Sequence, residues 1–195
     1  MARQGDLFAA AQMAAATEAA SSAPPLLAHQ LLSWQQRLAG HQTPLFAGET
    51  PSSQQQHLWR DGSEAPSELN PLTLQAQPLS FWRWPQPLVR GPALYFVIDR
   101  PLESGQALLL YIGETARAEQ RWKGEHDCKG YLAAYAEALQ TAGLRTRLSI
   151  SFCCDVPADT KARRALEQHL IQRWLPPFNK ETRGRWATPF HADGA

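Results

Sequence analysis

The sequence predicts an α+β fold: a small three-stranded antiparallel sheet flanked by helices, behind a helical and flexible N-terminal region. Two apolar segments, 93–98 and 108–112, show the alternation of β-strands on either side of a turn. A third alternating segment, 147–152, lies between two stretches whose apolar residues have helical spacing. A sheet of this size can bury a face under helices, so the domain is viable. We divide the chain into an N-terminal region, a domain and a tail, at residues 1–84, 85–186 and 187–195.

Length and composition exclude several classes of protein. At about 150 residues per domain, 195 residues form one or two domains. No run approaches ~18 consecutive apolar residues, so we predict no contact with a membrane. Three cysteines cannot make a disulfide framework and no secretory signal is evident, so we expect a cytoplasmic location. Residues 1–81 carry 3 Lys/Arg and 6 Asp/Glu (net −3), whereas residues 82–195 carry 16 and 12 (net +4), a balance that permits nucleic-acid binding.

The N-terminal region contains one predicted amphipathic helix and a predicted disordered linker. The alanine-rich segment Ala9–Ala20 favours a helix, although it has almost no larger apolar residues. Apolar residues recur at helical spacing over Pro25–Ala39, with prolines at the start and Gly40 after the end. Residues 43–72 are rich in Ser, Gln, Pro and Gly, and we predict that they are poorly ordered.

The segment Phe81–Pro87 (FWRWPQP) leads from the linker into the domain and has two interpretations. Aromatic and proline residues in such a segment usually pack as a lid on a core, and we favour this interpretation. The alternative is that its aromatic rings stack on nucleic-acid bases.

The first two strands of the domain are predicted to form a hairpin about Glu103, with Ser104 and Gly105 as turn residues. This register places Tyr95 opposite Tyr111. Because side chains alternate between the two faces of a strand, both tyrosines then lie on one face. The other face takes six apolar residues: Leu94, Phe96, Ile98, Leu108, Leu110 and Ile112.

Three helices complete the domain. We expect a short helix around Ala116–Lys123 and a second over Tyr131–Ala142. A third helix is expected over about Thr160–Leu175, with Asp159 as its N-cap and two prolines after its end. The predicted order of elements is therefore β-β-α-α-β-α.

Five elements of this domain resemble, in order, those of the GIY-YIG nuclease family. The segments 93–95 (ALY) and 111–113 (YIG) resemble the paired motif that the family places on the first two strands of its sheet. Arg121 stands where the family carries an arginine on its first helix. Glu167 stands where the last long helix carries a metal-binding glutamate, and Asn179 matches an asparagine that follows. The resemblance covers roughly residues 91–181.

The resemblance implies a metal-dependent endonuclease that hydrolyses DNA phosphodiester bonds, with Mg²⁺ or Mn²⁺ as cofactor. Its implied catalytic residues are Tyr95 and Tyr111 at the attacking water, Arg121 at the phosphate and Glu167 at the metal. The implied supporting residues are Gly113, His126 and Asn179. A hard ion keeps several waters, so one carboxylate plus phosphate oxygens can suffice to hold it. The guanidinium fork of an arginine matches a phosphate group.

Each of these residues also has a simpler structural interpretation. Strand tyrosines commonly pack on helices, and Glu167 could pair with Arg163 or Arg164 on a helix surface for about 0.3–0.5 kcal/mol. The conjunction of all of them favours the nuclease. The alternative function is a catalytically inactive nucleic-acid-binding module of the same fold. It is motivated by Glu125, at a position where family members often carry His or Tyr, with His126 one residue later.

Basic residues surround the candidate site. We predict that Arg117, Lys123 and Lys129 contact DNA, although interleaved acidic residues also fit an ordinary solvated surface. A zinc site is the less favoured use of the nearby cysteines, because no Cys-x-x-Cys occurs and the spacing matches no common zinc site.

The N-terminal segment 4–8 (QGDLF) resembles the short peptide that bacterial DNA-replication and repair proteins insert into the sliding clamp. Leu7 and Phe8 are the expected apolar anchors, and Gln4 the polar one. The clamp is therefore a second predicted partner, in DNA repair or recombination. The alternative is a terminus with no docking role.

Overall fold

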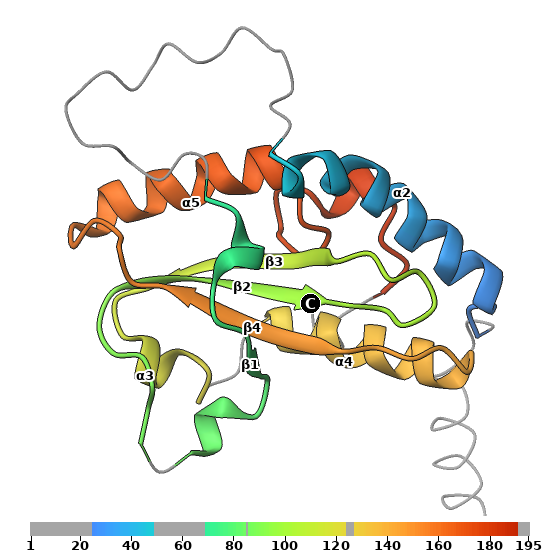
Figure 1. Ribbon diagram of the computed structural model, residues 1–195, viewed down its shortest axis with the longest axis horizontal. Helices are drawn as coiled ribbons and strands as arrows, with labels where there is room; N and C mark the ends of the chain where they lie inside the picture. Colours follow the sequence, from blue (N-terminus) through green and yellow to red (C-terminus); the bar gives the residue numbers. More distant parts are fainter. Residues whose placement is uncertain (1–24, 49–68, 85, 124–126, 191–195) are drawn as a thin grey trace, which may run out of the picture.

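The chain folds around a four-stranded antiparallel sheet with helices on both sides, an α+β fold (Figure 1). The computed structural model describes residues 25–48, 69–84, 86–123 and 127–190. The strand order is β1-β4-β2-β3. The strands span Gln77–Pro78 (β1), Ala93–Asp99 (β2), Leu108–Thr115 (β3) and Leu148–Cys153 (β4). The predicted α+β class is confirmed, and the three predicted strands are joined at one edge by the two-residue strand β1.

Four helices surround the sheet in the described part of the chain: α2 (Ala28–Phe46), α3 (Ala118–Arg121), α4 (Asp127–Thr141) and α5 (Thr160–Trp174). The predicted N-cap of α5 is confirmed, because the Asp159 carboxylate accepts a hydrogen bond of 2.8 Å from the Ala162 N–H. Short 3-10 helices lie at Pro71–Thr73 (η1), Phe81–Arg83 (η2) and Arg183–Trp186 (η3). Within the described ranges, no helix combines the length and apolarity needed to cross a lipid bilayer.

Several sequence predictions concern residues outside the described part of the chain. These are the helix at Ala9–Ala20, the clamp-binding residues Gln4, Leu7 and Phe8, the supporting residue His126, and residues 49–68 of the predicted linker. The ends of that linker are ordered elements, because residues 43–46 belong to α2 and residues 71–73 form η1.

The hairpin register differs from the predicted one. Tyr95 pairs with Gly113, not with Tyr111, and Tyr111 pairs with Val97. A bulge interrupts the β2–β3 pairing after Val97, where Ile98 pairs with Leu109 and leaves Leu110 as the extra residue on β3. The turn is thus not centred on Glu103. The prediction was wrong because the sequence pattern contains no signal for the extra residue.

The same bulge corrects the predicted faces of the sheet. Tyr95 and Tyr111 do lie on one face, as predicted. However, Leu108 and Leu110 belong to that face and not to the face of Ile112, because one extra residue inverts the alternation on one side of the bulge. The opposite face carries Leu94, Phe96, Ile98, Leu109 and Ile112.

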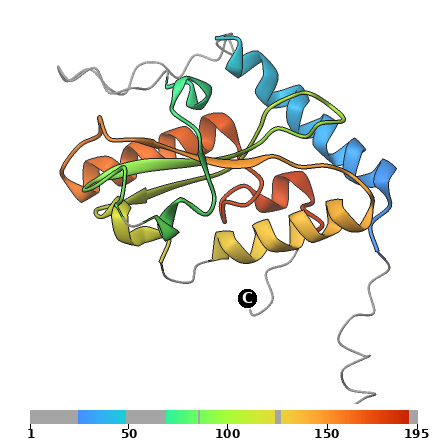
Figure 2. The ribbon, with the colours of Figure 1, turned by 60° about the horizontal axis from the view of Figure 1, so that its bottom comes forward.

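Both faces of the sheet are covered by helices, as Figures 1 and 2 show. On one face, α4 packs through Tyr135 and Leu139 against Tyr95 and Val97. On the other face, α5 packs its apolar side against β2 and β3. All seven residues of β2 are consequently buried.

Helix α2 is longer than predicted and joins the two cores. It continues through Gly40, the predicted stop, to Phe46. Glycine inside a helix costs about 1 kcal/mol relative to alanine, but the last turns make contacts that outweigh this cost. Leu38 is buried in the core on the α4 side and Leu45 in the core on the α5 side.

The outer edge of β3 is closed by side-chain and main-chain hydrogen bonds. The Gln42 amide accepts from the Leu109 N–H (2.8 Å) and donates to the Leu109 carbonyl (3.0 Å). The Asn179 amide does the same at Ile112, with distances of 3.0 and 2.8 Å. Between them the Phe178 N–H donates to the Leu110 carbonyl at 3.0 Å. An unpaired strand edge invites aggregation, and these contacts occupy this one.

A buried polar network ties α2 and α4 to the far end of β2. The Asp99 carboxylate is fully buried and accepts from the Tyr135 hydroxyl (2.7 Å), the Thr146 hydroxyl (2.7 Å) and the Arg147 N–H (2.8 Å). The Gln35 amide donates to the Tyr135 hydroxyl at 2.7 Å. Burial raises the pKa of Asp99, and these hydrogen bonds oppose the rise.

Replacing Asp99 by alanine should lower the free energy of unfolding by about 3 kcal/mol, because one buried and two partly buried donors lose their acceptor. Urea denaturation followed by circular dichroism measures the change. Glu103→Ala, which removes an exposed ion pair with Arg145, is the matched control and should leave the unfolding midpoint in place. Equal midpoints for Asp99→Ala and the wild type would contradict a stabilising network.

Candidate active site

Tyr95 occupies the centre of the sheet with its ring over the backbone of β3. Its cross-strand partner is Gly113, and a Cβ built on that glycine would lie 2.3 Å from both Cζ and the hydroxyl oxygen of Tyr95. No side chain fits in that space. Gly113 is therefore required for steric reasons: its bare backbone lets the phenol reach across β3.

Tyr111 lies beside Tyr95 and extends toward the edge of the sheet. The two rings are stacked, with centroids 5.9 Å apart and an angle of 29° between their planes. Tyr95 is fully buried, whereas Tyr111 is half-buried and lines a cavity. The pair thus connects the core of the sheet with a surface opening.

Arg121, the last residue of α3, contacts the hydroxyl group of Tyr95. Its Nε donates a hydrogen bond of 3.0 Å to the phenol oxygen, and its Cζ lies 5.9 Å from the ring centroid. Helix α3 is held in place at Gly91, whose carbonyl accepts from the Ala118 N–H (2.9 Å). The Gly91 N–H donates to the Glu119 carboxylate (3.0 Å).

Glu167 lies on α5 and lines the same cavity as Tyr111. The cavity has a volume of about 160 Å³. Its polar and charged lining comes from α5, β3 and the segment after α5, and consists of Tyr111, Glu167, Gln168, Asn179, Lys180, Glu181 and Arg183. The four predicted catalytic residues therefore form one continuous series, from Arg121 through the two tyrosines to Glu167.

The carboxyl group of Glu167 has a pKa raised to about 7. Burial is the main cause, and the nearby carboxylates of Glu114 and Glu181 raise it further. A hydrogen bond from the backbone of Glu114 and the charge of Arg164 act in the opposite direction. A positive charge in the adjoining cavity would stabilise the ionised form of this carboxyl group.

Glu114 is held beside Glu167 by two arginines of α5. The Arg163 Nε lies 2.9 Å from one carboxylate oxygen of Glu114, and the Arg164 Nε lies 3.3 Å from the other. Arg163 is itself buried, and its guanidinium also donates to the carbonyls of Pro157 and Ala158 at 3.1 and 3.0 Å. The two arginines that the sequence offered as partners of Glu167 thus make their ion pairs with Glu114.

Both tyrosines hold their protons firmly in this structure. Burial raises the pKa of Tyr95 well above its ordinary value, Tyr111 adds to the rise, and Arg121 opposes it. Burial also raises the pKa of Tyr111 to about 12. Arg121 alone does not offset burial, so Tyr95 is a neutral phenol at neutral pH, suited to orient a water molecule by hydrogen bonding.

The remaining predicted residues divide between the site and the surface. Asn179 lines the cavity, and both ends of its amide are bonded to β3, so it positions the segment after α5. Arg117 and Lys123 are exposed near α3. Lys129 lies against Trp122. Its Nζ donates a hydrogen bond of 2.7 Å to the Trp122 carbonyl and lies 5.8 Å from the centroid of the indole ring.

Sequence reasoning did not identify Glu114, Lys180 and Arg183 as site residues. Arg183 donates from Nη1 to the Tyr131 hydroxyl and lies 4.8 Å from that ring, a contact between α4 and the segment after α5. Strand alternation could have placed Glu114 on the face of Ile112, toward α5. Nothing in the local pattern could have identified Lys180 or Arg183, because they reach the cavity through the turn that follows α5.

The donor set at Glu167 fits a hydrated hard ion better than a closed metal cage. In the part of the chain that the structure describes, no group of three or more His, Cys, Asp or Glu side chains is arranged to hold a metal. The carboxyl group of Glu167, at an open cavity that Glu181 also lines, suits Mg²⁺ or Mn²⁺ that retains water and accepts phosphate oxygens. Cys128 and Cys153 lie in the cores on opposite faces of the sheet.

Comparisons of this chain with models of protein families, with curated proteins and with solved structures found no match.

Replacing Gly113 by alanine should displace the ring of Tyr95 and destabilise the fold by about 1–3 kcal/mol, because the new methyl group overlaps the phenol. Thermal unfolding measures the loss. Gly40→Ala is the matched control: its Cβ meets nothing within 4 Å, and alanine inside α2 should stabilise the protein by about 0.5–1 kcal/mol. A Gly113→Ala protein as stable as the wild type would contradict this packing.

Replacing Glu167 by glutamine should stabilise the protein at high pH only. Because the folded pKa is raised, ionisation of Glu167 costs folding free energy as pH rises from 4.5 to about 7, and the cost persists above that range. We expect a gain of about 1–2 kcal/mol near pH 8, discounted for partial exposure, and none near pH 4. Urea unfolding at the two pH values measures it, and a difference that does not depend on pH would contradict the assignment.

Proposed function

We propose that this protein is a metal-dependent endonuclease of the GIY-YIG type that hydrolyses phosphodiester bonds of DNA. The observation that supports the proposal best is the continuous contact series from Arg121 through Tyr95 and Tyr111 to the cavity of Glu167. These four residues lie on β2, β3, α3 and α5, so their convergence is a property of the fold and not of local sequence. Cleavage of a phosphodiester needs an oriented water and stabilisation of the developing charge. Tyr111 and Glu167 at the cavity, with Tyr95 and Arg121 behind Tyr111, are residues suited to these tasks.

Arg121 is the proposed phosphate-binding residue. Its Nε bond to Tyr95 fixes the plane of the guanidinium, and the two Nη atoms complete a donor fork that matches two phosphate oxygens. Lysine would not replace it, because an ammonium group cannot hold the phenol and form a planar fork at the same time. Lys180 and Arg183 supply further positive charge at the cavity.

Tyr95 and Tyr111 are the proposed residues at the attacking water. Tyr95 keeps its proton and orients the water through its hydroxyl group, and the stacked ring of Tyr111 holds Tyr95 in place. Burial of Tyr95 excludes bulk water from the inner side of the site.

Glu167 is the proposed ligand of Mg²⁺ or Mn²⁺, and Asn179 holds the segment that carries the rest of the cavity wall. When bound, the ion supplies Lewis-acid stabilisation of the charge that develops on phosphoryl and leaving-group oxygens. Arg163 and Arg164 support this role indirectly, because they neutralise Glu114 and so limit the repulsion at Glu167.

The alternative is a nucleic-acid-binding module that has lost cleavage. The raised pKa of Tyr95 favours it, since a phenol that resists ionisation is a weak base. Glu125 and the supporting residue His126 lie outside the described residues, so their part in the site stays a prediction. Docking to a sliding clamp through Gln4, Leu7 and Phe8, in DNA repair or recombination, likewise stays a proposal.

Purified wild-type protein should nick supercoiled plasmid DNA in the presence of Mg²⁺ or Mn²⁺ and should be inactive in EDTA. Glu167→Ala should lower the rate by at least about 100-fold, and Arg121→Ala by a similar factor, because each removes charge stabilisation in the transition state. Gel electrophoresis of the nicked product measures the rate.

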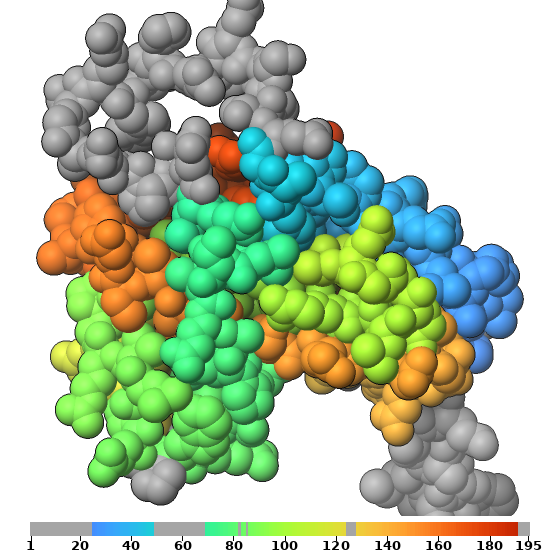
Figure 3. Space-filling model, viewed as in Figure 1, coloured from blue at the N-terminus to red at the C-terminus, as the bar shows by residue number. Residues whose placement is uncertain are grey.

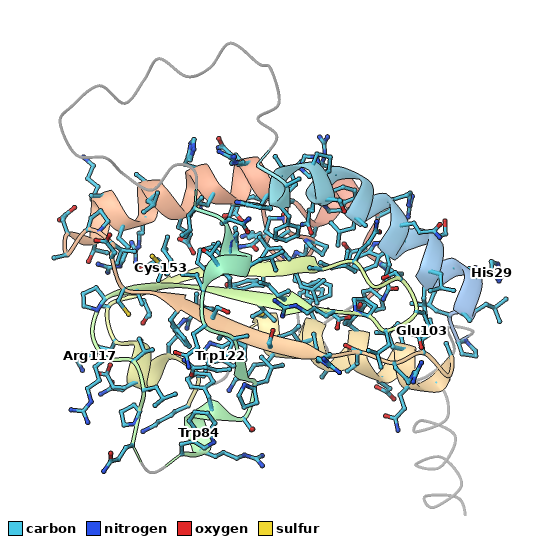
Figure 4. The ribbon with its side chains drawn as sticks, viewed as in Figure 1. His29, Trp84, Glu103, Arg117, Trp122 and Cys153 are labelled. Atoms are coloured by element: carbon cyan, nitrogen blue, oxygen red, sulfur yellow. The ribbon has the colours of Figure 1, made fainter. Side chains whose placement is uncertain are left out.

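Glu103→Ala is the matched control for removal of a carboxylate. Glu103 lies in the turn between β2 and β3, and Figure 4 shows it far from Arg117, which directly precedes the helix of Arg121. Its rate should equal that of the wild type. Nicking by Glu167→Ala at the wild-type rate would mean a contaminating nuclease and would remove the enzyme proposal. Binding of DNA without nicking by any variant would favour the inactive module.

A further inference from the structure

Residues 79–84 and 86–92 form a surface platform beside α3. Phe81 anchors one end: it is buried, with its ring centroid 5.2 Å from that of Phe152 and 6.2 Å from that of Trp122. Gly91 anchors the other end through its two hydrogen bonds to α3. In Figure 3 this segment, coloured green, makes up the lower projecting part of the visible face.

Between these anchors the platform exposes large apolar side chains. Trp84 is 41% exposed and Leu88 is 60% exposed. The lid interpretation of the FWRWPQP segment therefore holds for Phe81 but not for Trp84, which projects away from the sheet (Figure 4). An indole exposed at the surface is a ready face for stacking.

Three exposed arginines lie on the platform and at the start of α3. Arg83, Arg90 and Arg117 are exposed, and we call these three arginines together with Trp84 the α3 surface. Backbone hydrogen bonds, including that from Gly91, lower the pKa of Glu119, and the charges of Arg117 and Arg90 lower it further. Arg90 and Arg117 thus both lie near the carboxylate of Glu119.

We propose that the α3 surface binds a single-stranded segment of DNA that adjoins the cleavage site. The proposal rests on the proposed nuclease function for the identity of its partner. Unpaired bases can stack on Trp84 while phosphates contact the three arginines, the combination that sequence-independent single-strand binding requires. The bases of a duplex are stacked on one another and offer no face to an indole, so a single strand is the occupant that uses both features.

The α3 surface and the proposed phosphate-binding residue Arg121 share helix α3. Arg117 directly precedes α3 and Arg121 ends it, one helical turn later. A strand that runs along this turn passes from Arg117 to the guanidinium that contacts Tyr95. The substrate class that follows is DNA with a single-stranded segment next to the scissile bond, such as a flap or a gap.

Fluorescence anisotropy of a labelled thymidine oligonucleotide, and of a blunt duplex of the same length, tests the proposal with the full chain in EDTA. Trp84→Ala should weaken binding of the single strand about tenfold, because stacking contributes about 1–3 kcal/mol per base. It should leave duplex binding unchanged. Leu88→Ala, an exposed apolar residue of the same platform, is the matched control and should change neither affinity.

Arg90→Ala and Arg117→Ala should weaken binding of both nucleic acids and reduce the salt slope by about 1 each, because each removes one phosphate contact. Circular dichroism confirms that the variants fold. Equal single-strand affinity of Trp84→Ala and the wild type, or an equal loss in Leu88→Ala, would overturn the proposal. Because binding is measured without metal, a protein that binds as expected but never nicks plasmid would contradict only the proposed enzyme.

Discussion

The close approach of Tyr95 to the backbone of β3 is the constraint on which the site depends. Only glycine at position 113 leaves room for the phenol, and the contact fixes which residues of the two strands face one another. Once Tyr95 lies there, Tyr111, which is two residues before Gly113 on β3, stacks against its ring. The hydroxyl of Tyr95 accepts a hydrogen bond from Arg121. One steric condition therefore aligns three functional side chains from three elements.

The amide caps along the edge of β3 complete the arrangement. Gln42 and Asn179 occupy backbone groups that a further strand would otherwise use, and Asn179 brings the segment after α5 against the sheet. The cavity forms between that segment, Glu167 and Tyr111. The cavity thus lies at the edge of the sheet, and Tyr95 stays buried behind it.

Sequence patterns were sufficient for the elements but not for their exact pairing. Alternation and helical spacing predicted β2, β3, β4, α4 and α5, because each buries an apolar face. The bulge at Leu110, the extension of α2 past Gly40 and the network at Asp99 depend on contacts between distant segments, which local patterns do not encode. The same holds for Lys180 and Arg183 at the cavity, whereas Tyr95, Tyr111, Arg121 and Glu167 could be proposed because a family resemblance orders them along the chain.

The proposed function requires that a divalent ion binds at Glu167, within reach of the tyrosine pair. Paramagnetic broadening by Mn²⁺ of the ring signals of the four tyrosines, followed by NMR, tests it most directly because it detects weak binding at a known position. We expect Mn²⁺ to broaden the signal of Tyr111 in the wild type and to leave it sharp in Glu167→Ala. Equal broadening of Tyr111 in both proteins, or none in either, would contradict a metal site at Glu167.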